Sequence, residues 1–364
     1  MSDEIGELYF LGEIDLETRN FTNYVKIGRV GSGPRRSTEV RILEHQTGNP
    51  REIKDRKVIK APRVKDLEKL LHGVFTSDCV GGEWFEFTEE ALEKAINYAE
   101  KKAKELFELQ DVELKVRKLK ETVSAKEELP ADKRLRDLAC RVHFLKQRVK
   151  EIQEALDRIK KTTEDIESER VKQGLLDEED KSTKKRADPQ PAFKKKALES
   201  EDQDLYSEFC EIEKKLVVKP LLISKSIKNA IEDGEVFFKE WSKELGQIEK
   251  LISDTSELIS SKSESDEFRD NLETNRAELE KYKSKYKFRV QNYEIHLQYA
   301  CGLNSGIREV CTWKRVFETK KVFNVANFKE RHPDIYEQYV RSSRPTKSII
   351  YDKTRRRKKK KNDV

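Results

Sequence analysis

The segment Tyr24-Val25-Lys26-Ile27-Gly28-Arg29 decides how the first part of the chain folds. It is typical of a β-strand that ends in a glycine turn. A second strand-like run, Glu7-Leu8-Tyr9-Phe10-Leu11, lies upstream, and the polar residues 15–23 between the two are rich in turn formers. The simplest interpretation is a β-hairpin that returns through the first segment.

The sequence downstream predicts two helices and two further strands around this hairpin. Ser37 or Thr38 can cap a helix that stops before Gly48-Asn49-Pro50. A second helix follows Pro62, because the apolar residues there recur at helical spacing. The order β-β-α-β-α-β, then helix, predicts a compact α+β domain with a small antiparallel sheet flanked by helices. The remaining features are a strand at 57–60, the apolar stripe Leu67, Leu70, Leu71, Val74 and Phe75, a strand at 84–87 and a long helix beginning after Thr88.

Each of the two helices carries a polar pair spaced by one turn. Arg41 and His45 share one face of the first helix, and Glu68 and His72 lie at the edge of the apolar stripe of the second. Taken singly, such a pair is more typical of a helix surface than of a catalytic site, and a tyrosine in a strand, such as Tyr9, is usually a core residue. Whether these residues are catalytic therefore depends on the order and spacing of all the motifs in this part of the chain.

That ordered set resembles the GIY-YIG nuclease superfamily over residues 7–87. It is most similar to a branch of phage and viral type in which the second motif reads Lys-Ile-Gly. The order and the spacing of the motifs both fit. The matching segments are Leu8-Tyr9-Phe10, Lys26-Ile27-Gly28, Arg41 followed by Gln46-Thr47-Gly48-Asn49-Pro50, Leu67-Glu68 with His72 and Phe75, and Gly82-Glu83-Trp84-Phe85.

The resemblance implies metal-assisted hydrolysis of phosphodiester bonds. Glu68 would be the sole protein ligand of a divalent cation, Mg²⁺ or Mn²⁺; Mg²⁺ keeps several waters and takes few carboxylates. Tyr9 would orient or deprotonate the attacking water. Lys26 would place a charge on the phosphate or act as a base. Arg41 would stabilise the charge of the phosphoryl transition state.

Two histidines complete the site that the resemblance implies. His45 matches a histidine that some restriction enzymes of the superfamily use near the nucleophile, and His72 would support Glu68 from one turn away. The sequence departs from the family pattern in Glu7-Leu8, which replaces Gly-Ile, and in Lys26, which stands where many members carry a tyrosine. A non-catalytic DNA-binding or recombination-accessory protein that keeps the fold is therefore the alternative to a nuclease. A coiled-coil structural adaptor is a third hypothesis.

Basic residues gather in two parts of the chain, and both predict DNA as a partner. Residues 26–69 hold 13 Lys and Arg against 6 Asp and Glu, and residues 305–364 hold 18 against 7. The tail 355–361 consists of Lys and Arg alone, so it should bind phosphate backbones without sequence preference. The expected DNA-contacting residues are Arg29, Arg35, Arg36, Arg355, Arg356, Arg357, Lys358, Lys359, Lys360 and Lys361.

The middle of the chain is predicted to be long, mostly α-helical and coiled-coil. An apolar stripe with alternating spacings of three and four residues runs through 135–159, which predicts a coiled coil. It favours a homodimer through 135–166, and an antiparallel pairing with 241–286 in the same chain is the alternative. Residues 168–200 are predicted to be a charged linker. The stripe consists of Leu135, Leu138, Val142, Leu145, Val149, Ile152, Leu156 and Ile159, and a second helical run is expected through Leu205, Phe209, Ile212 and Leu216.

The C-terminal part changes to aromatic and basic residues. Residues 293–299 alternate like a strand, although a helix is also compatible. The segments Gly306-Ile307, Thr312-Trp313-Lys314 and 327–339 faintly resemble the closing part of YqaJ-type phage recombination nucleases. The carboxylate-rich core of those nucleases is missing, so no catalytic residue is carried over. The segment is interpreted as a small module for phosphate and base contacts, or as a structural cap on the coiled coil.

The cysteines and the apolar segments limit which cellular compartments the sequence predicts. Five cysteines without a Cys-x-x-Cys pair, and no signal peptide, predict free thiols in the cytoplasm, associated with a nucleoid or within a nucleus according to the cell. No apolar run approaches the length of a membrane helix, so no membrane partner is expected. The expected domains are 1–100 (nuclease-like), 101–167 (helical), 168–200 (linker), 201–286 (helical), 287–350 (basic-aromatic module) and 351–364 (polybasic tail).

Overall fold

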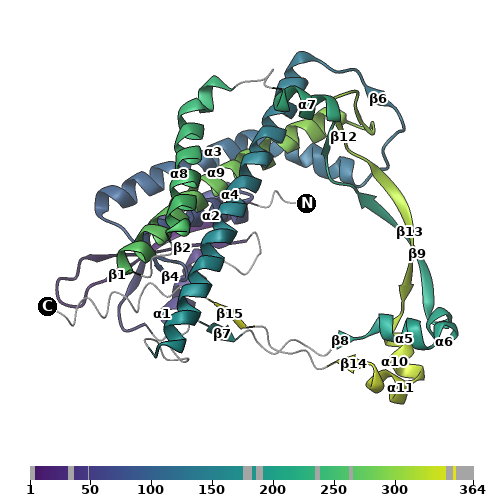
Figure 1. Cartoon of the computed structure of the whole chain (residues 1–364), viewed down its shortest axis with the longest axis horizontal. Helices are drawn as coiled ribbons and strands as arrows, with labels where there is room; N and C mark the ends of the chain where they lie inside the picture. The colour runs from purple at the N-terminus through teal and green to yellow at the C-terminus, as the bar shows by residue number, and fades with distance from the viewer. Residues whose placement is uncertain are drawn as a thin grey trace.

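The computed structural model of the chain describes residues 5–31, 37–47, 49–174, 183–185, 192–233, 238–261, 265–341 and 347–349. Three parts can be followed in Figure 1: an N-terminal sheet with its helices, a group of long helices, and a β-ribbon that leads away to a small helical head. This arrangement agrees with the predicted layout of an α+β domain, a long helical region and a small C-terminal segment.

Within the described residues, the N-terminal sheet has five strands in the order β3-β1-β2-β5-β4. The predicted hairpin is present, and its register places Tyr9 opposite Gly28 and Leu11 opposite Lys26. Ser37 and Thr88 cap the helices that they were expected to start. A short strand, β4, is added to the predicted order before β5. The elements are β1 Ile5–Ile14, β2 Phe21–Val30, α1 Thr38–Gln46, β3 Ile53–Pro62, α2 Val64–Val74, η1 Thr76–Asp78, β4 Cys79–Gly81, β5 Trp84–Glu86 and α3 Glu89–Lys120.

The two faces of this sheet are covered by different helices. Successive side chains of a strand point to opposite faces. Leu8, Phe10 and Ile27 pack with α2 and α3 in one core cluster. Tyr9 packs on the other face, in a smaller cluster that receives Ile42 from α1. The predicted pairs on α1 and α2 therefore approach the sheet from opposite sides.

The N-terminal domain is not a separate unit tethered to the helices. Helix α3 continues without a break from the sheet into the helical part, and α9 (Asp266–Cys301) packs against both α2 and α3. Phe288 of α9 is 3% exposed and belongs to the same core cluster as the sheet. At Gly73 of α2 a Cβ would lie 1.8 Å from Ser284 Oγ, so the two helices touch closely at this point. Packing of this kind fixes the sheet relative to the long helices.

The apolar stripe predicted for 135–159 lies in one continuous helix, α4. Its residues Val142, Leu145, Ile152 and Ile159 are fully buried, and α4 packs along α9 and α8 of the same chain. The seam that favoured a homodimer is therefore occupied within the chain, as the intramolecular alternative expected. Residues 293–299, for which a strand was considered, are helical and belong to α9. The long helices are α4 Lys133–Lys172, α8 Ser242–Ser260 and α9 Asp266–Cys301.

The helix predicted through Ile212 and Leu216 is wrong. Both residues lie in strand β9, Cys210–Val218, which pairs antiparallel with β13, Arg315–Phe323. The spacing of four between Ile212 and Leu216 fits a helix, but it also fits one face of a strand. The hydrogen-bonding partner of β9 lies about a hundred residues away along the chain, so no local pattern shows it. Figure 1 shows the two strands as a ribbon that reaches from the long helices to the head.

The head at the far end of the ribbon is held by aromatic packing. Phe209, Phe323 and Phe328 are buried together, with Tyr206 stacked on Phe323 at 4.9 Å between ring centroids. Residues 168–200, expected to be a linker, include the end of α4, two short strands and the start of this head. The head elements are β8 Ala192–Phe193, α5 Lys195–Glu201, α6 Gln203–Glu208, α10 Val325–Arg331, α11 Pro333–Gln338 and β14 Val340–Arg341.

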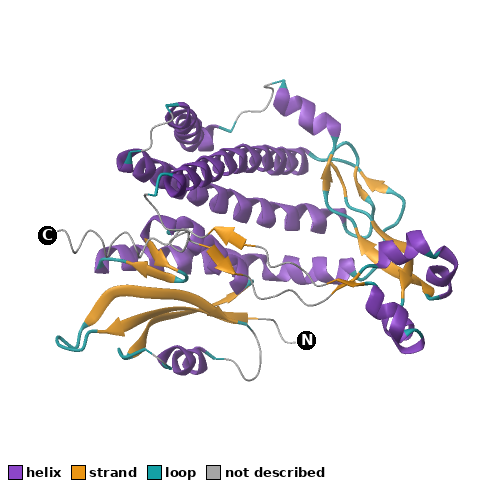
Figure 2. Ribbon diagram, turned by 60° about the horizontal axis from the view of Figure 1, so that its bottom comes forward, coloured by secondary structure: helices purple, strands orange, loops and turns teal. Residues whose placement is uncertain are grey.

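A small sheet lies at the base of the ribbon, in the order β10-β12-β11-β6. Figure 2 shows these strands between the ends of the long helices and the ribbon. Among the helices that the structure describes, none is long and apolar enough to cross a membrane. The remaining elements are β6 Glu128–Leu129, β7 Thr183–Lys185, β10 Leu222–Ile223, α7 Lys225–Glu232, η3 Lys239–Trp241, β11 Gly306–Ile307, β12 Cys311–Thr312 and β15 Lys347–Ile349.

Candidate active site

The Lys-Ile-Gly motif has its glycine because a tyrosine lies over it. Tyr9 and Gly28 are opposite each other on β1 and β2. A Cβ at Gly28 would lie 2.4 Å from the phenol oxygen of Tyr9, so any larger residue would displace the ring. The hairpin thereby fixes the place of the Tyr9 hydroxyl on the face that α1 covers.

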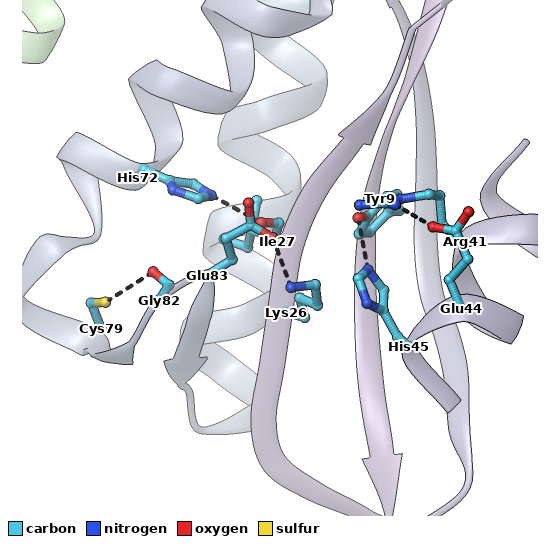
Figure 3. Close-up of polar contacts among 10 residues, drawn as sticks. All are labelled: Tyr9, Lys26, Ile27, Arg41, Glu44, His45, His72, Cys79, Gly82 and Glu83. Carbon is cyan, nitrogen blue, oxygen red and sulfur yellow. Dashed lines mark hydrogen bonds and ion pairs between the residues drawn. The ribbon is translucent and has the colours of Figure 1, made fainter. Parts of the chain in front are cut away.

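Helix α1 brings two of the predicted catalytic residues to that hydroxyl. The Tyr9 hydroxyl lies 3.3 Å from Nε2 of His45, and the guanidinium of Arg41 lies close enough to oppose the rise in the pKa of the phenol. Arg41 is paired in turn with Glu44, one turn along α1. Figure 3 shows Tyr9 between Arg41 and His45, with Lys26 on the neighbouring strand. The structure therefore brings Tyr9, Lys26, Arg41 and His45 into one site.

The environment keeps both Tyr9 and His45 neutral near neutral pH. Burial raises the pKa of the Tyr9 phenol, against the opposite effect of Arg41. Burial also lowers the pKa of the His45 imidazole, and the charges of Lys26 and Arg41 lower it further. A neutral phenol donates a hydrogen bond, and a neutral imidazole can accept a proton. Of the two groups, His45 is therefore the better candidate for a general base.

Lys26 is buried and ion-paired, which the sequence did not show. Its residue exposure is 8%, and its Nζ lies 2.7 Å from Oε2 of Glu83. Burial would raise the pKa of the Glu83 carboxyl, but the hydrogen bond and charge of Lys26 outweigh it and lower the pKa. Because an unpaired buried ammonium is costly, the Glu83 carboxylate compensates for the burial of Lys26.

Glu83 is the residue of this site that sequence reasoning missed. It stands in the matched segment Gly82-Glu83-Trp84-Phe85, but no role was given to it there. The backbone oxygen of Glu83 accepts a hydrogen bond from the Ile27 amide at 3.0 Å, which sets its side chain beside β2. One signal was available: Lys26 stands within the apolar strand segment Tyr24–Ile27, and a lysine buried in such a strand needs a carboxylate nearby.

Glu68 and His72 reach β2 from α2, and each contacts a different part of the strand. Oε2 of Glu68 accepts a hydrogen bond from Nε of Arg29 at 2.7 Å, and Nε2 of His72 lies 2.9 Å from the backbone oxygen of Ile27. His72 therefore contacts the strand rather than Glu68, unlike the support that was expected of it. Glu68 is nevertheless close enough to influence Tyr9, because its negative charge contributes to the raised pKa of the Tyr9 phenol.

Glu68 fits a magnesium ion better than a metal that needs several protein ligands. The described residues contain no group of three or more His, Cys, Asp or Glu side chains arranged to hold an ion. The Glu68 side chain is 16% exposed, so it remains reachable from solvent. One carboxylate together with water molecules is a common protein environment for Mg²⁺.

The expected DNA-contacting residues divide between the described part of the chain and the rest. Arg29 is described and is paired with Glu68. Arg35, Arg36, Arg355, Arg356, Arg357, Lys358, Lys359, Lys360 and Lys361 lie outside the described residues.

Residues 8–101 match the T5orf172 domain, a domain associated with phage nuclease-type proteins. The match begins in β1 and ends in α3, so it contains all of the residues of the site described above. It suggests a nuclease-related or DNA-binding role for this part of the chain. No curated protein and no solved structure matched the chain.

Proposed function

We propose that residues 8–101 form a metal-dependent endonuclease domain of GIY-YIG type that hydrolyses phosphodiester bonds in DNA. The observation that carries this proposal is the hydrogen-bonded pair of Tyr9 and His45 with two cations, Lys26 and Arg41, beside it. A neutral acid–base pair next to two fixed positive charges suits an attack by water on an anionic ester.

Each residue of the pair has a distinct task in this reaction. His45 takes the proton of the attacking water through an imidazole that is neutral at working pH. Tyr9 donates a hydrogen bond and orients the water or a phosphate oxygen, and its raised pKa argues against a role as the base. General acid–base help of this kind typically contributes about 10²–10⁴ in rate.

The two cations act on the phosphate. Arg41 can present two N–H groups to phosphate oxygens, a geometry suited to the transition state. Lys26 supplies a fixed charge whose position is set by Glu83 at 2.7 Å. Glu68 would hold Mg²⁺ or Mn²⁺, and the ion would polarise the scissile phosphate and stabilise the leaving oxygen.

A DNA-binding protein without hydrolytic activity is the second candidate, and one contact favours it. The carboxylate of Glu68 is already paired with Arg29 at 2.7 Å, and that pair must open or rearrange before Glu68 can bind an ion. If the pair stays closed, the basic surface of the domain would still bind DNA.

Cleavage of supercoiled plasmid separates the two candidates. Wild-type protein would be incubated with plasmid in Mg²⁺, and in a second series in Mn²⁺, beside Glu68→Ala and Arg41→Ala. We expect nicked or linear plasmid with the wild type and intact plasmid with both variants. Glu90→Ala is the matched control, since Glu90 is an exposed carboxylate on α3 that pairs with Lys94. Intact plasmid with wild type in both metals would reject the endonuclease and leave the binding protein.

A further inference from the structure

The ribbon of β9 and β13 sorts its charges between its two faces. Directly opposed residues of an antiparallel pair lie on the same face, and the side chains alternate along each strand. The register opposes Glu213 to Lys320 and Glu318 to Lys215, so these four lie on one face together with Glu211. The acidic residues of the two strands are all on this face, which we call the mixed face.

The opposite face of the ribbon carries cations and apolar groups but no acid. Its central residues are Ile212, Lys214, Leu216, Phe317, Thr319 and Lys321, as the register requires. We call this the basic face. Its two ammonium groups are not paired with a carboxylate anywhere in the described part of the chain, and Lys214 instead lies 5.1 Å from the ring centroid of Phe317.

The large apolar side chains on the basic face are open to solvent. Ile212 is 74% exposed and Phe317 is 54% exposed. The basic face therefore offers a partner both apolar and cationic contacts on one narrow surface.

The ribbon is held at both ends, so this face is presented on a stiff support. At the base, the buried guanidinium of Arg315 stacks on Trp313 at 4.2 Å and donates hydrogen bonds to the backbone oxygens of Thr122 and Gly302. At the far end, Phe323 is 3% exposed in the aromatic cluster of the head. An isolated two-stranded ribbon is barely stable in water, and these anchors supply what it lacks.

From these observations we infer that the basic face of the β9–β13 ribbon is a docking surface for duplex DNA. The basic face has lysines and no carboxylates, so its positive charge favours a polyanion as the partner. The shape selects a duplex, because the major groove of B-form DNA admits a two-stranded β-ribbon. Lys214 and Lys321 contact phosphates across the groove, and Phe317 and Ile212 meet apolar base edges such as the thymine methyl group.

This surface is distinct from the N-terminal site. Figures 1 and 2 both show the ribbon at one end of the long helices, away from the N-terminal sheet. The inference rests on the proposed function only in taking DNA as the polyanion. It concerns binding alone, so it requires no cleavage by Tyr9, His45 or Glu68.

The two faces supply a matched pair of variants for the test. Lys214→Gln with Lys321→Gln removes two charges from the basic face. Lys215→Gln with Lys320→Gln removes two charges from the same strands on the mixed face. Binding of the full chain to a fluorescent mixed-sequence duplex would be measured by anisotropy in EDTA, over a range of salt concentrations, so that no cleavage interferes.

We expect the basic-face variant to bind about tenfold or more weakly at 0.1 M salt, with a salt slope shallower by about 1.8 for two lost phosphate contacts. The mixed-face variant should stay within about twofold of wild type. Equal losses in the two variants, or no loss in the basic-face variant, would overturn the inference. Because the readout is binding in EDTA, these outcomes are independent of whether the N-terminal site cleaves DNA.

Two further measurements test whether duplex DNA is the ligand of the basic face. Phe317→Ser should weaken DNA binding without changing the salt slope, because it removes contact area but no charge. An RNA duplex of the same sequence should bind more weakly and be insensitive to the substitutions, since its major groove is too narrow for a ribbon. If the substitutions weakened binding of the RNA duplex as much as binding of the DNA duplex, insertion of the ribbon into the major groove would be rejected. A wild-type dimer in sedimentation that Phe317→Ser converts to monomer, with DNA affinity unchanged, would instead make the face an interface between copies and overturn the proposal.

Discussion

The N-terminal site and the β9–β13 ribbon are both basic, but they hold their charges in opposite ways. In the N-terminal site each cation is paired: Lys26 with Glu83, Arg29 with Glu68 and Arg41 with Glu44. On the basic face of the ribbon, Lys214 and Lys321 are exposed, with no carboxylate partner among the described residues.

The difference separates two uses of positive charge. A cation paired with a neighbouring carboxylate keeps its position and reorganises little when charge develops beside it, which suits catalysis. An exposed, unpaired cation is free to exchange its counterion for a phosphate, which suits binding. Substitutions in the first region should therefore change rate and stability, and those in the second should change affinity.

The largest effect is expected at Glu68. Glu68→Gln keeps the size of the side chain and removes the charge that would hold the metal. We expect the cleavage rate to fall by about 10³-fold, equivalent to roughly 4 kcal/mol of transition-state stabilisation. Binding of duplex DNA in EDTA should not weaken. Single-turnover cleavage beside Glu90→Gln would check this, and a rate within tenfold of wild type would remove Glu68 from the mechanism.

A second substitution tests whether Arg41 acts through its geometry or only through its charge. Arg41→Lys keeps the positive charge but loses the planar fork that can hold two phosphate oxygens. We expect the rate to fall by about 10²-fold. The same kinetic assay measures this change. Full activity in the lysine variant would mean that a point charge at this position is sufficient.

The buried ion pair should respond unequally to loss of its two partners. Glu83→Gln leaves the Lys26 ammonium buried without a countercharge, and we expect unfolding to become easier by about 1–3 kcal/mol in urea. Lys26→Met leaves only the half-exposed Glu83 carboxylate, so its effect should be smaller. An equal loss of unfolding free energy in the two variants would show that Lys26 is not buried and dependent on Glu83 as its countercharge.

The pH dependence of this pair has a definite sign. The pKa of Glu83 is lowered in the folded state, so the stabilisation is present above the ordinary carboxyl pKa and is lost as pH falls through the lowered value. Wild type and Glu83→Gln should therefore converge in stability towards acid pH. Divergence in that direction would contradict the assignment.

The titration of His45 tests the proposed base. Its pKa is lowered by burial and by the charges of Lys26 and Arg41, so the imidazole should titrate below its usual value of about 6.5. Activity should consequently rise with pH below that value and then level off. In Lys26→Met the pKa should move up, because a positive charge is removed. Histidine NMR of both proteins measures the shift, and a His45 already protonated at neutral pH could not act as the base.

The smallest effect is expected for stability at the ribbon. Lys214→Gln with Lys321→Gln removes exposed charges that pair with no described carboxylate, so the free energy of unfolding should stay within about 0.5 kcal/mol of wild type. Urea unfolding beside Glu83→Gln makes the contrast direct. A loss comparable with that of Glu83→Gln would mean that the ribbon lysines are structural.

The parts of the fold that rest on local signals were predicted from the sequence. Ser37 and Thr88 were expected as helix caps and are, and the hairpin of β1 and β2 has the strands that the Lys-Ile-Gly motif indicated. Caps and hairpins depend on residues a few positions apart, which a single sequence displays.

The parts that depend on distant contacts were not predicted. Glu83 meets Lys26 across 57 positions, and no local pattern joins them. Strand β9 was interpreted as helix because its partner β13 comes about a hundred residues later. The stripe of α4 was predicted correctly as a buried seam, but its partner, α9, could not be chosen from periodicity alone, because a stripe of this kind fits any complementary helix.

The division of labour between the two regions can be tested in one measurement. Single-turnover cleavage of a duplex in Mg²⁺ would be followed against protein concentration for wild type, Glu68→Gln, and Lys214→Gln with Lys321→Gln. We predict that Glu68→Gln reaches a plateau rate about 10³-fold below wild type. The ribbon variant should reach the wild-type plateau only at about tenfold higher protein concentration. A ribbon variant with a lowered plateau, or Glu68→Gln with an unchanged one, would contradict the account.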